Sequence, residues 1–178
     1  MLASRQRSPR PNWPLDRGKA VPGSGRFLPP SITVYARDAQ GDVAPLRTIA
    51  GDRTRLNWPT GVAVDPVRGE LFVANDVDSS ILVFDADAHG NAAPLRVIKG
   101  PKTGIKNPTG VFLDAKNNEL WVANFGGHSL GVFRPTADGD IAPLRTLRSA
   151  PEGVPSLMIG NPGAVAFDTK RGEILVPN

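Results

Sequence analysis

Residues 61–96 read GVAVDPVRGELFVANDVDSSILVFDADAHGNAAPLR, and this stretch decides the fold because copies of it return along the chain. It ends in the tetrapeptide APLR, which stands at residues 44–47, 93–96 and 142–145, with a step of 49 residues each time. Self-similarity at a fixed period of a few tens of residues is typical of repeat proteins. The sequence therefore predicts one structural unit for each period.

A second element of the copy follows the same period. The segment ELFVAN at residues 70–75 returns as ELWVAN at 119–124, again after 49 residues, and as EILVPN at 173–178, after 54. The five extra residues of the last step fall in the Pro- and Gly-bearing run 148–158, which we interpret as a loop. The repeat thus extends to the last residue of the sequence.

Each copy is predicted to form four short strands. In the first full copy they are residues 61–65, 71–75, 81–84 and 95–98, because these runs are short, rich in Val, Ile, Leu and Phe, and bounded by turn residues. The second and third runs are apolar on both alternating faces, so we expect both faces to be covered. The fourth run carries Arg96 and follows a Pro, as is typical of an outer edge strand.

A four-stranded antiparallel unit of this kind predicts an all-β fold, a β-propeller segment built of blades. Residues 32–36 and 46–49 supply the last two strands of one blade, two full blades follow, and the remaining residues up to Asn178 supply the first two strands of another. Three blades' worth of strands do not close a ring, since propellers have four to eight blades. Either two chains pair as half-rings into six blades, or the chain is part of a longer propeller with further blades.

The segments NPTGVFLD, ELWVANF and SLGVF, with APLRTL closing the unit, resemble the NHL-repeat and YVTN-type β-propeller repeats common in bacterial proteins. The resemblance covers residues 31–178. It implies the propeller fold but not one function, because such repeats occur in scaffolds, peptide binders, RNA binders, lyases and lactone hydrolases. Two features depart from the pattern. The period of 49 is long, and Pro177 stands where the other copies have Ala74 and Ala123, so we expect that strand to end early or to pair over a shorter length.

Residues 1–30 have a different composition from the repeats. They are rich in Arg, Pro, Gly and Ser and carry six Lys or Arg against one Asp, whereas residues 31–178 carry 15 Lys and Arg against 16 Asp and Glu. We expect 1–30 to be a basic disordered tail and 31–178 to be propeller repeats. A signal peptide and a membrane-spanning run are not visible, and the chain lacks Cys. The compartment stays open, because similar propellers are often exported.

Candidate ligand-binding residues lie in the loops that are expected to open around the propeller channel. They are polar or aromatic residues that suit a small polar ligand or a peptide: Trp58, Asn75, Asp76, Asp78, Asn124, Phe125 and His128. An Asn that every copy repeats is more often a loop-closing residue than a ligand contact. Trp58 and His128 interrupt the repeat, and they are the better candidates for specificity.

The sequence offers no catalytic constellation, and we predict no cofactor and no metal. The expected function is a non-catalytic binding or scaffolding module for a protein, a peptide or a small polar ligand. One alternative is part of a metal-dependent lactonase-like or lyase-like propeller enzyme, to which Asn75, Asp76 and Asn124 could contribute oxygen ligands. A second alternative, an NHL-type RNA-binding module, is disfavoured by the near-neutral charge of 31–178. No partner beyond a second copy, missing blades or a protein or peptide ligand is expected.

A repeated Arg in the fourth strand of each copy could form a basic rim for an anionic partner. We instead predict local ion pairs or hydrogen bonds across the preceding turn, because each Arg follows a polar residue by five positions. The pairs are Asp42 with Arg47, Asn91 with Arg96, and Asp140 with Arg145. Such surface pairs contribute roughly 0–1 kcal/mol. The run 85–91 superficially resembles a calcium loop but is better interpreted as a turn, since Arg96 stands where the bidentate Glu would be.

Overall fold

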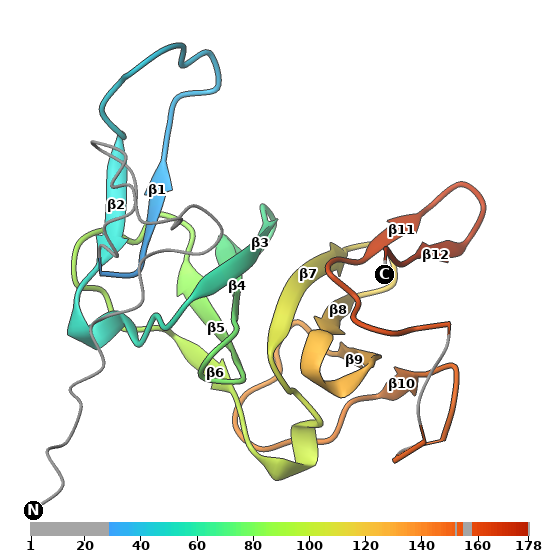
Figure 1. Cartoon of the computed structure of the whole chain (residues 1–178). Helices are drawn as coiled ribbons and strands as arrows, with labels where there is room; N and C mark the ends of the chain where they lie inside the picture. The colour runs from blue at the N-terminus through green and yellow to red at the C-terminus, as the bar shows by residue number, and fades with distance from the viewer. Residues whose placement is uncertain (1–28, 152, 155–157, 178) are drawn as a thin grey trace, which may run out of the picture.

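A computed structural model describes residues 29–151, 153–154 and 158–177. Within these ranges the chain forms twelve β-strands and three short 3₁₀ helices, and the described residues contain no α-helix. The strands form four antiparallel sheets that stand side by side in chain order (Figure 1). The predicted disordered tail, residues 1–30, lies outside the described residues except for its last two positions.

The first and last sheets have two strands each, and the middle two have four. The two-stranded sheets contain β1 (Ser31–Val34) with β2 (Arg47–Ala50), and β11 (Ala166–Asp168) with β12 (Glu173–Leu175). The second sheet contains β3 (Pro59–Asp65), β4 (Glu70–Asn75), β5 (Ser80–Asp85) and β6 (Arg96–Ile98). The third contains β7 (Pro108–Asp114), β8 (Glu119–Asn124), β9 (Ser129–Phe133) and β10 (Arg145–Leu147). This order confirms the predicted half blade, two full blades and half blade.

The 3₁₀ helices lie in the loops at one end of the sheets. They are η1 (Asp52–Thr54), η2 (Pro101–Thr103) and η3 (Phe125–Gly127). At the same end, β12 stops at Leu175, two residues before Pro177, while the equivalent β4 and β8 run for six residues. Pro lacks the N–H that a ladder requires, which accounts for the early end that the sequence suggested.

An Asp side chain closes the hairpin between the first two strands of each complete blade. The Asp65 carboxylate accepts hydrogen bonds from the N–H groups of Val67 (2.9 Å) and Arg68 (3.0 Å), and it pairs with the Arg68 guanidinium at 2.7 Å. Burial alone would raise the pKa of the Asp65 carboxyl, but these hydrogen bonds outweigh burial and lower that pKa below its usual value. Asp114 and Asp168 form the corresponding turns. The turn is thus set by a local side-chain contact.

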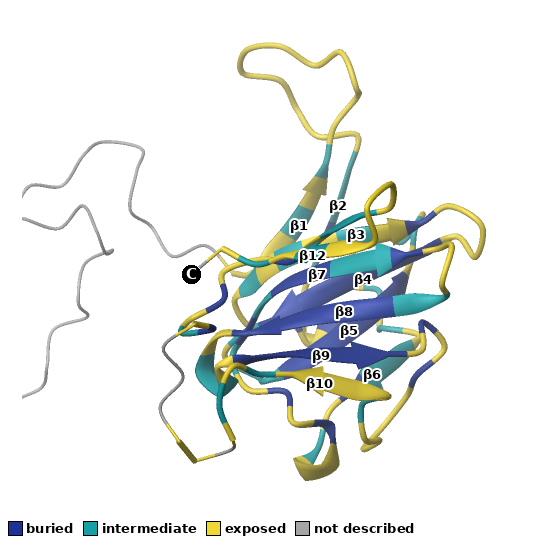
Figure 2. Ribbon diagram, turned by 90° about the vertical axis from the view of Figure 1, so that its right-hand side faces the viewer, coloured by how far each residue is buried: buried dark blue, intermediate teal, exposed yellow. Residues whose placement is uncertain are grey.

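The core consists of layers between neighbouring sheets, because the middle strands are apolar on both faces. Phe72 and Ala74 pack towards the third sheet, whereas Leu71 and Val73 pack towards the first. Figure 2 shows that β4, β5, β8 and β9 are the most deeply buried strands. This arrangement confirms the prediction that these strands are covered on both sides.

The two half blades leave parts of their neighbours uncovered. Val62 in β3 is 54% exposed, whereas its repeat equivalent in β7, Val111, is 9% exposed. At the other end, Leu147 in β10 is 41% exposed, whereas its equivalent in β6, Ile98, is fully buried. The difference follows from the size of the end sheets, since each has two strands among the described residues and covers only half of the blade beside it.

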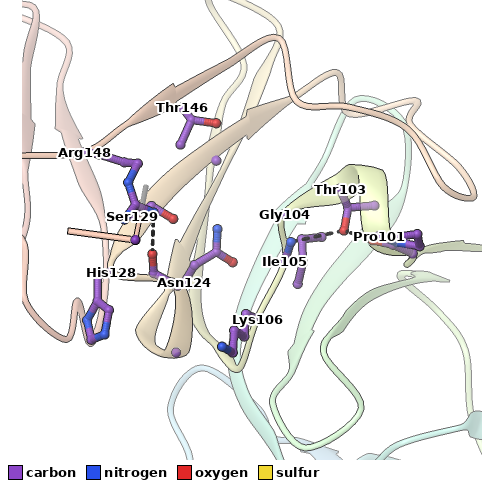
Figure 3. Close-up of a pocket in the computed structure, with 15 residues that line it drawn as sticks. Pro101, Thr103, Gly104, Ile105, Lys106, Asn124, His128, Ser129, Thr146 and Arg148 are labelled. Carbon is purple, nitrogen blue, oxygen red and sulfur yellow. Dashed lines mark hydrogen bonds between the residues drawn. The ribbon is translucent and has the colours of Figure 1, made fainter. Parts of the chain in front are cut away.

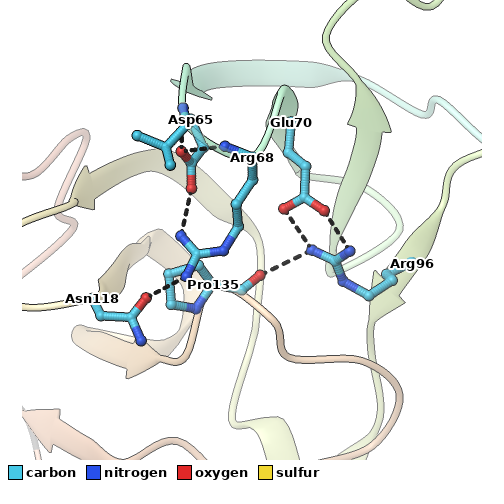
Figure 4. Close-up of polar contacts among 7 residues, drawn as sticks. Asp65, Arg68, Glu70, Arg96, Asn118 and Pro135 are labelled. Atoms are coloured by element: carbon cyan, nitrogen blue, oxygen red, sulfur yellow. Dashed lines mark hydrogen bonds and ion pairs between the residues drawn. The ribbon is translucent and has the colours of Figure 1, made fainter.

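The predicted local pairs of the repeated Arg residues are wrong in all three copies. Arg47 pairs with Asp87 of the next blade at 3.7 Å and not with Asp42. The Arg96 guanidinium instead binds the Glu70 carboxylate at the start of β4 through two hydrogen bonds of 2.6 and 2.9 Å. It also donates to the Pro135 carbonyl oxygen of the next blade at 3.0 Å (Figure 4). The turn residue Asn91 instead accepts a hydrogen bond from the backbone N–H of Arg53. The Glu70–Arg96 pair could not be predicted from local spacing, because the order of the strands in the sheet brings these two side chains together.

The third sheet repeats this Glu–Arg contact. Arg145 binds Glu119 through hydrogen bonds of 2.5 and 2.7 Å, and its guanidinium lies over the Trp121 ring at 4.9 Å from the ring centre. The hydrogen bond from Arg145 lowers the pKa of the Glu119 carboxyl below its usual value, against an opposing effect of burial. Asp140, the predicted partner, accepts a hydrogen bond from the N–H of Lys102. We call this contact between the second and fourth strands the blade clasp.

Candidate functional site

The loops that enter each full blade meet the loop between its second and third strands. The N–H of Asp76 donates to the Trp58 carbonyl oxygen at 3.1 Å, and the N–H of Phe125 donates to the Asn107 carbonyl oxygen at the same distance. The structure therefore brings the candidate residues together in two groups, one in each full blade. Trp58, Asn75, Asp76 and Asp78 form one group, and Asn124, Phe125 and His128 form the other.

Asn75 and its repeat equivalent Asn124 are both buried but differ in their contacts. The Asn75 side chain accepts from the N–H of Asn57 at 2.6 Å and donates to the Arg55 carbonyl oxygen and to Ser80 Oγ, both at 3.1 Å. Asn75 thus connects the loop before β3 to the loop between β4 and β5. Asn124 is 2% exposed, and its Oδ1 has no hydrogen-bond partner among the described residues.

Asp78 is part of an internal ion pair in the second sheet's loop. Its carboxylate accepts from Lys99 Nζ at 2.5 Å and from Ser80 Oγ at 3.2 Å. At the equivalent position of the next blade stands Gly127, which has no carboxylate, and the equivalent of Lys99 is Arg148. Arg148 Nη1 donates to the Gly127 carbonyl oxygen at 2.8 Å instead.

The aromatic candidates and the His are exposed. Trp58 and Phe125 have exposed side chains on the loop face, and Trp58 has a positive φ of 62°. The His128 ring contacts the Gly160 carbonyl oxygen through Nδ1, and its backbone has a φ of 49°. The αL conformation of His128 ends η3, and Ser79 at the equivalent turn of the other blade also has a positive φ.

A pocket of about 600 Å³ opens between the η2 loop and the η3 loop of the third sheet. Figure 3 shows His128 and Arg148 on one side of it and Thr103, Ile105 and Lys106 on the other. The lining residues that bear side chains are Pro101, Thr103, Ile105, Lys106, Asn124, His128, Ser129, Thr146 and Arg148. The described lining contains two cationic side chains, Lys106 and Arg148, and no Asp or Glu.

Two of the seven predicted residues, Asn124 and His128, line this pocket, and the other five do not. Sequence reasoning missed Lys106 and Arg148. The signal was present, because comparison at the 49-residue period places Arg148 on Lys99 and Gly127 on Asp78. The second full blade therefore keeps a cationic residue at this position, Arg148, but has no carboxylate residue at the position of Asp78. This difference between the two copies identifies the pocket position in the sequence.

Within residues 29–151, 153–154 and 158–177, no group of three or more His, Cys, Asp or Glu side chains is placed to hold a metal ion. Across these same ranges, no helix has the length and apolar character needed to cross a membrane.

Comparison with known proteins gives structural likeness only. No protein-family model matches the chain, and no curated protein sequence matches it either. Hydrazine synthase from Kuenenia stuttgartiensis is similar in structure with a TM-score of 0.50 and 15% identity, over 70% of this chain and 30% of that chain. A functionally unknown protein from Desulfotomaculum acetoxidans is similar with a TM-score of 0.52 and 18% identity, over 75% and 38% of the two chains.

The WD40 β-propeller domain of Doa1 is also similar, with a TM-score of 0.47 and 17% identity, over 66% of this chain and 33% of that chain. The chain therefore spans about a third of the length of these solved structures. Its four side-by-side antiparallel sheets define it as a β-propeller segment. Identities this low show the fold alone, and membership of the NHL-repeat or YVTN-type families stays a prediction.

Proposed function

We propose that this chain is a non-catalytic scaffolding module that binds a second copy of itself by completing the two half blades. In this assembly, strands β1 and β2 of one copy join β11 and β12 of the other, and two copies form a six-bladed ring. The observation that carries the proposal is the complementarity of the two ends, which together contain the four strands of one blade in the correct order.

The repeat defines the register of the new strand pair. In the second sheet Leu71 pairs with Phe84, and Phe72 pairs with Val83. By the repeat, Ile174 of one copy would face Tyr35 of the other, and Leu175 would face Val34. Tyr35 and Leu175 are now exposed, and β1 and β12 each have one ladder partner among the described strands. Pairing would bury apolar side chains and satisfy backbone groups at two sheet edges.

The blade clasp supplies matched charges at the same join. Arg47 is the repeat equivalent of Arg96, and it already donates to the Ala86 carbonyl oxygen of the next blade at 2.6 Å, as Arg96 does to Pro135. Glu173 is the equivalent of Glu70, and its side chain makes no hydrogen bond or ion pair with another described residue. Joining the half blades would place Arg47 of one copy against Glu173 of the other.

The surfaces beside the edges are shaped for the same occupant. A groove of about 600 Å³ lies between the outer strand of the third sheet and β12, where the third and fourth strands of a complete blade would stand. Trp121, Leu147 and Ile174 are among its apolar lining residues. At the other end, the exposed Val62 would be covered by the β11–β12 half blade of the partner, as Val111 is covered within the chain.

The test is the molar mass of the full chain by light scattering during size-exclusion chromatography over a range of concentrations. We expect a dimer for the natural sequence and weakened dimers for Arg47→Glu and Glu173→Arg, with dissociation constants raised about tenfold or more by like-charge contacts. A mixture of the two variants should recover the dimer, because one join then keeps the natural pair and the other holds the same two charges exchanged. Arg134→Glu, at an exposed turn, is the matched control.

Two outcomes would contradict the proposal. A folded, soluble monomer at every concentration would show that a second copy does not complete the half blades. A dimer that neither charge reversal weakens would show that the copies meet through another surface.

A further inference from the structure

We infer that the pocket between the η2 and η3 loops binds a ligand through a carboxylate group. The inference concerns one chain and does not depend on the assembly of two copies. It starts from a comparison of this pocket with the same place in the preceding blade, where four of the lining glycines are replaced by residues with longer side chains.

Several glycines line the pocket where the preceding blade has residues with longer side chains. At the 49-residue step, Arg55, Val77, Asp78 and Leu82 of the second sheet and its loops correspond to Gly104, Gly126, Gly127 and Gly131, all of which line the pocket. A Cβ atom added at Gly104 would meet no atom within 4 Å. The space is therefore open at the position where the preceding blade holds a long side chain.

The preceding blade also shows which chemical group the position of Gly127 can hold. There the Asp78 carboxylate accepts hydrogen bonds from Lys99 Nζ and Ser80 Oγ. The next blade keeps both kinds of donor, as Arg148 and Ser129, but has Gly127 in place of the acid. A ligand carboxylate at the place of the absent Asp side chain would restore the same pair of contacts. Arg148 Nη1 and Nε donate to the carbonyl oxygens of Gly127 and Ala150, so the remaining N–H groups of the guanidinium would bind the carboxylate.

Two further features of the pocket fit an external anionic ligand with polar atoms. Lys106 adds a second cation to the lining, where the preceding blade has Asn57. The buried Oδ1 of Asn124 lacks the hydrogen bond that Asn75 receives from a backbone N–H. Figure 3 shows the Asn124 side chain between the Arg148 side of the pocket and the Ile105 side.

The experiment titrates the full chain with acetate and, separately, with acetamide, which has a similar shape but no charge. The readouts are ¹⁵N NMR shifts of the backbone amides of Gly126 and Gly127 and of the Arg148 Nε–H group. We expect saturable shifts with acetate and none with acetamide. N-acetyl-diglycine and its C-terminal amide then distinguish the carboxylate of a peptide end from that of a small free acid.

Variants at the carboxylate position make the test specific. Gly127→Asp restores the internal acid and should weaken acetate binding about tenfold or more, the loss expected for a charge-assisted hydrogen bond. Gly127→Ala is the matched control for size, since its Cβ would lie 3.3 Å from Asn124 Cβ and Ser129 Oγ, a contact that small shifts relieve. Arg148→Gln should weaken binding like Gly127→Asp, and Lys99→Gln should not.

Three results would overturn the inference. Equal shifts with acetate and acetamide would show that the charge is not recognised. Unchanged acetate affinity in both Gly127→Asp and Arg148→Gln would show that the anion binds elsewhere. Shifts that rise in proportion to the acetate concentration and never saturate would show a general effect of salt and no binding site.

Discussion

Replacement of Arg96 by Met should destabilise the chain more than the same change at its repeat equivalent, Arg145. The Arg96 and Glu70 side chains are 21% and 12% exposed, whereas Arg145 is 52% exposed. Arg96→Met leaves the Glu70 carboxylate largely buried without its partner, and it also removes the hydrogen bond to the Pro135 carbonyl oxygen. Breaking a buried ion pair by removing one partner costs about 3–5 kcal/mol, so we expect about 3 kcal/mol at this partly buried site.

The control is Arg145→Met, which breaks the same kind of Glu–Arg ion pair with a more exposed Arg. The Glu119 side chain is 15% exposed, close to the value for Glu70, but its partner Arg145 is 52% exposed. Because Arg145→Met removes a side chain that lies between Glu119 and the solvent, water can reach the carboxylate, and we expect about 1 kcal/mol there. Urea denaturation followed by circular dichroism measures both free energies of unfolding, and the double variant Glu70→Leu with Arg96→Met should recover part of the loss. Equal losses for the two single variants, or a loss below about 1 kcal/mol for Arg96→Met, would refute the role of burial in the clasp.

Three further predictions concern the core, acid stability and the loops. Phe72→Ala removes a fully buried ring and should cost about 3–5 kcal/mol in thermal or urea unfolding. Because the folded pKa of Glu119 is lowered, its stabilising effect should be complete above the usual value of 4.5 and be lost as the pH falls through the folded pKa. In urea unfolding measured from pH 7 to pH 2, the free energy of unfolding of Glu119→Gln should therefore fall less with decreasing pH than that of the natural sequence. Asn75→Ala should cost more than Asn124→Ala in urea unfolding, since only the Asn75 side chain makes three loop-closing hydrogen bonds.

The strands and the order of the blades could be predicted because both follow from short sequence patterns that repeat along the chain. Short apolar runs marked each strand, and a turn such as residues 65–69 separated the first two strands of a blade. The 49-residue period then supplied the tertiary order, since equal segments must form equal units. The early end of β12 also followed from one residue, Pro177, because its ring removes the N–H donor.

The blade clasp could not be predicted from local spacing. Glu70 and Arg96 are 26 residues apart, and they meet because the Arg side chain reaches across β5 to the beginning of β4. The expected local pair placed Arg96 with Asn91, which has its own acceptor role towards Arg53. A sequence pattern ranks near neighbours first, whereas a sheet brings together residues that are one or two strands apart.

The pocket was harder to predict because absent side chains define it. Searching for chemistry selected residues that bear functional groups, such as Asp76 and His128. The pocket depends instead on Gly126 and Gly127, and on Arg148, which donates to a backbone carbonyl oxygen where its equivalent in the preceding blade binds a carboxylate. A position at which one repeat copy has a side chain and the next copy has Gly is found by comparing the aligned copies. It is not found by examining each copy alone.

A pocket made by removing an internal carboxylate should reduce the stability of its own loop. Gly127→Asp would give Arg148 a carboxylate partner like the Asp78–Lys99 pair, and replacing Gly lowers the entropy of the unfolded chain, an effect of about 0.4–1 kcal/mol. We therefore expect this variant to melt at a higher temperature than the natural sequence when no carboxylate is present. Added acetate should narrow the difference, because it stabilises only the chain with an empty pocket. A lower melting temperature for Gly127→Asp than for Gly127→Ala would show that the pocket has no place for a carboxylate.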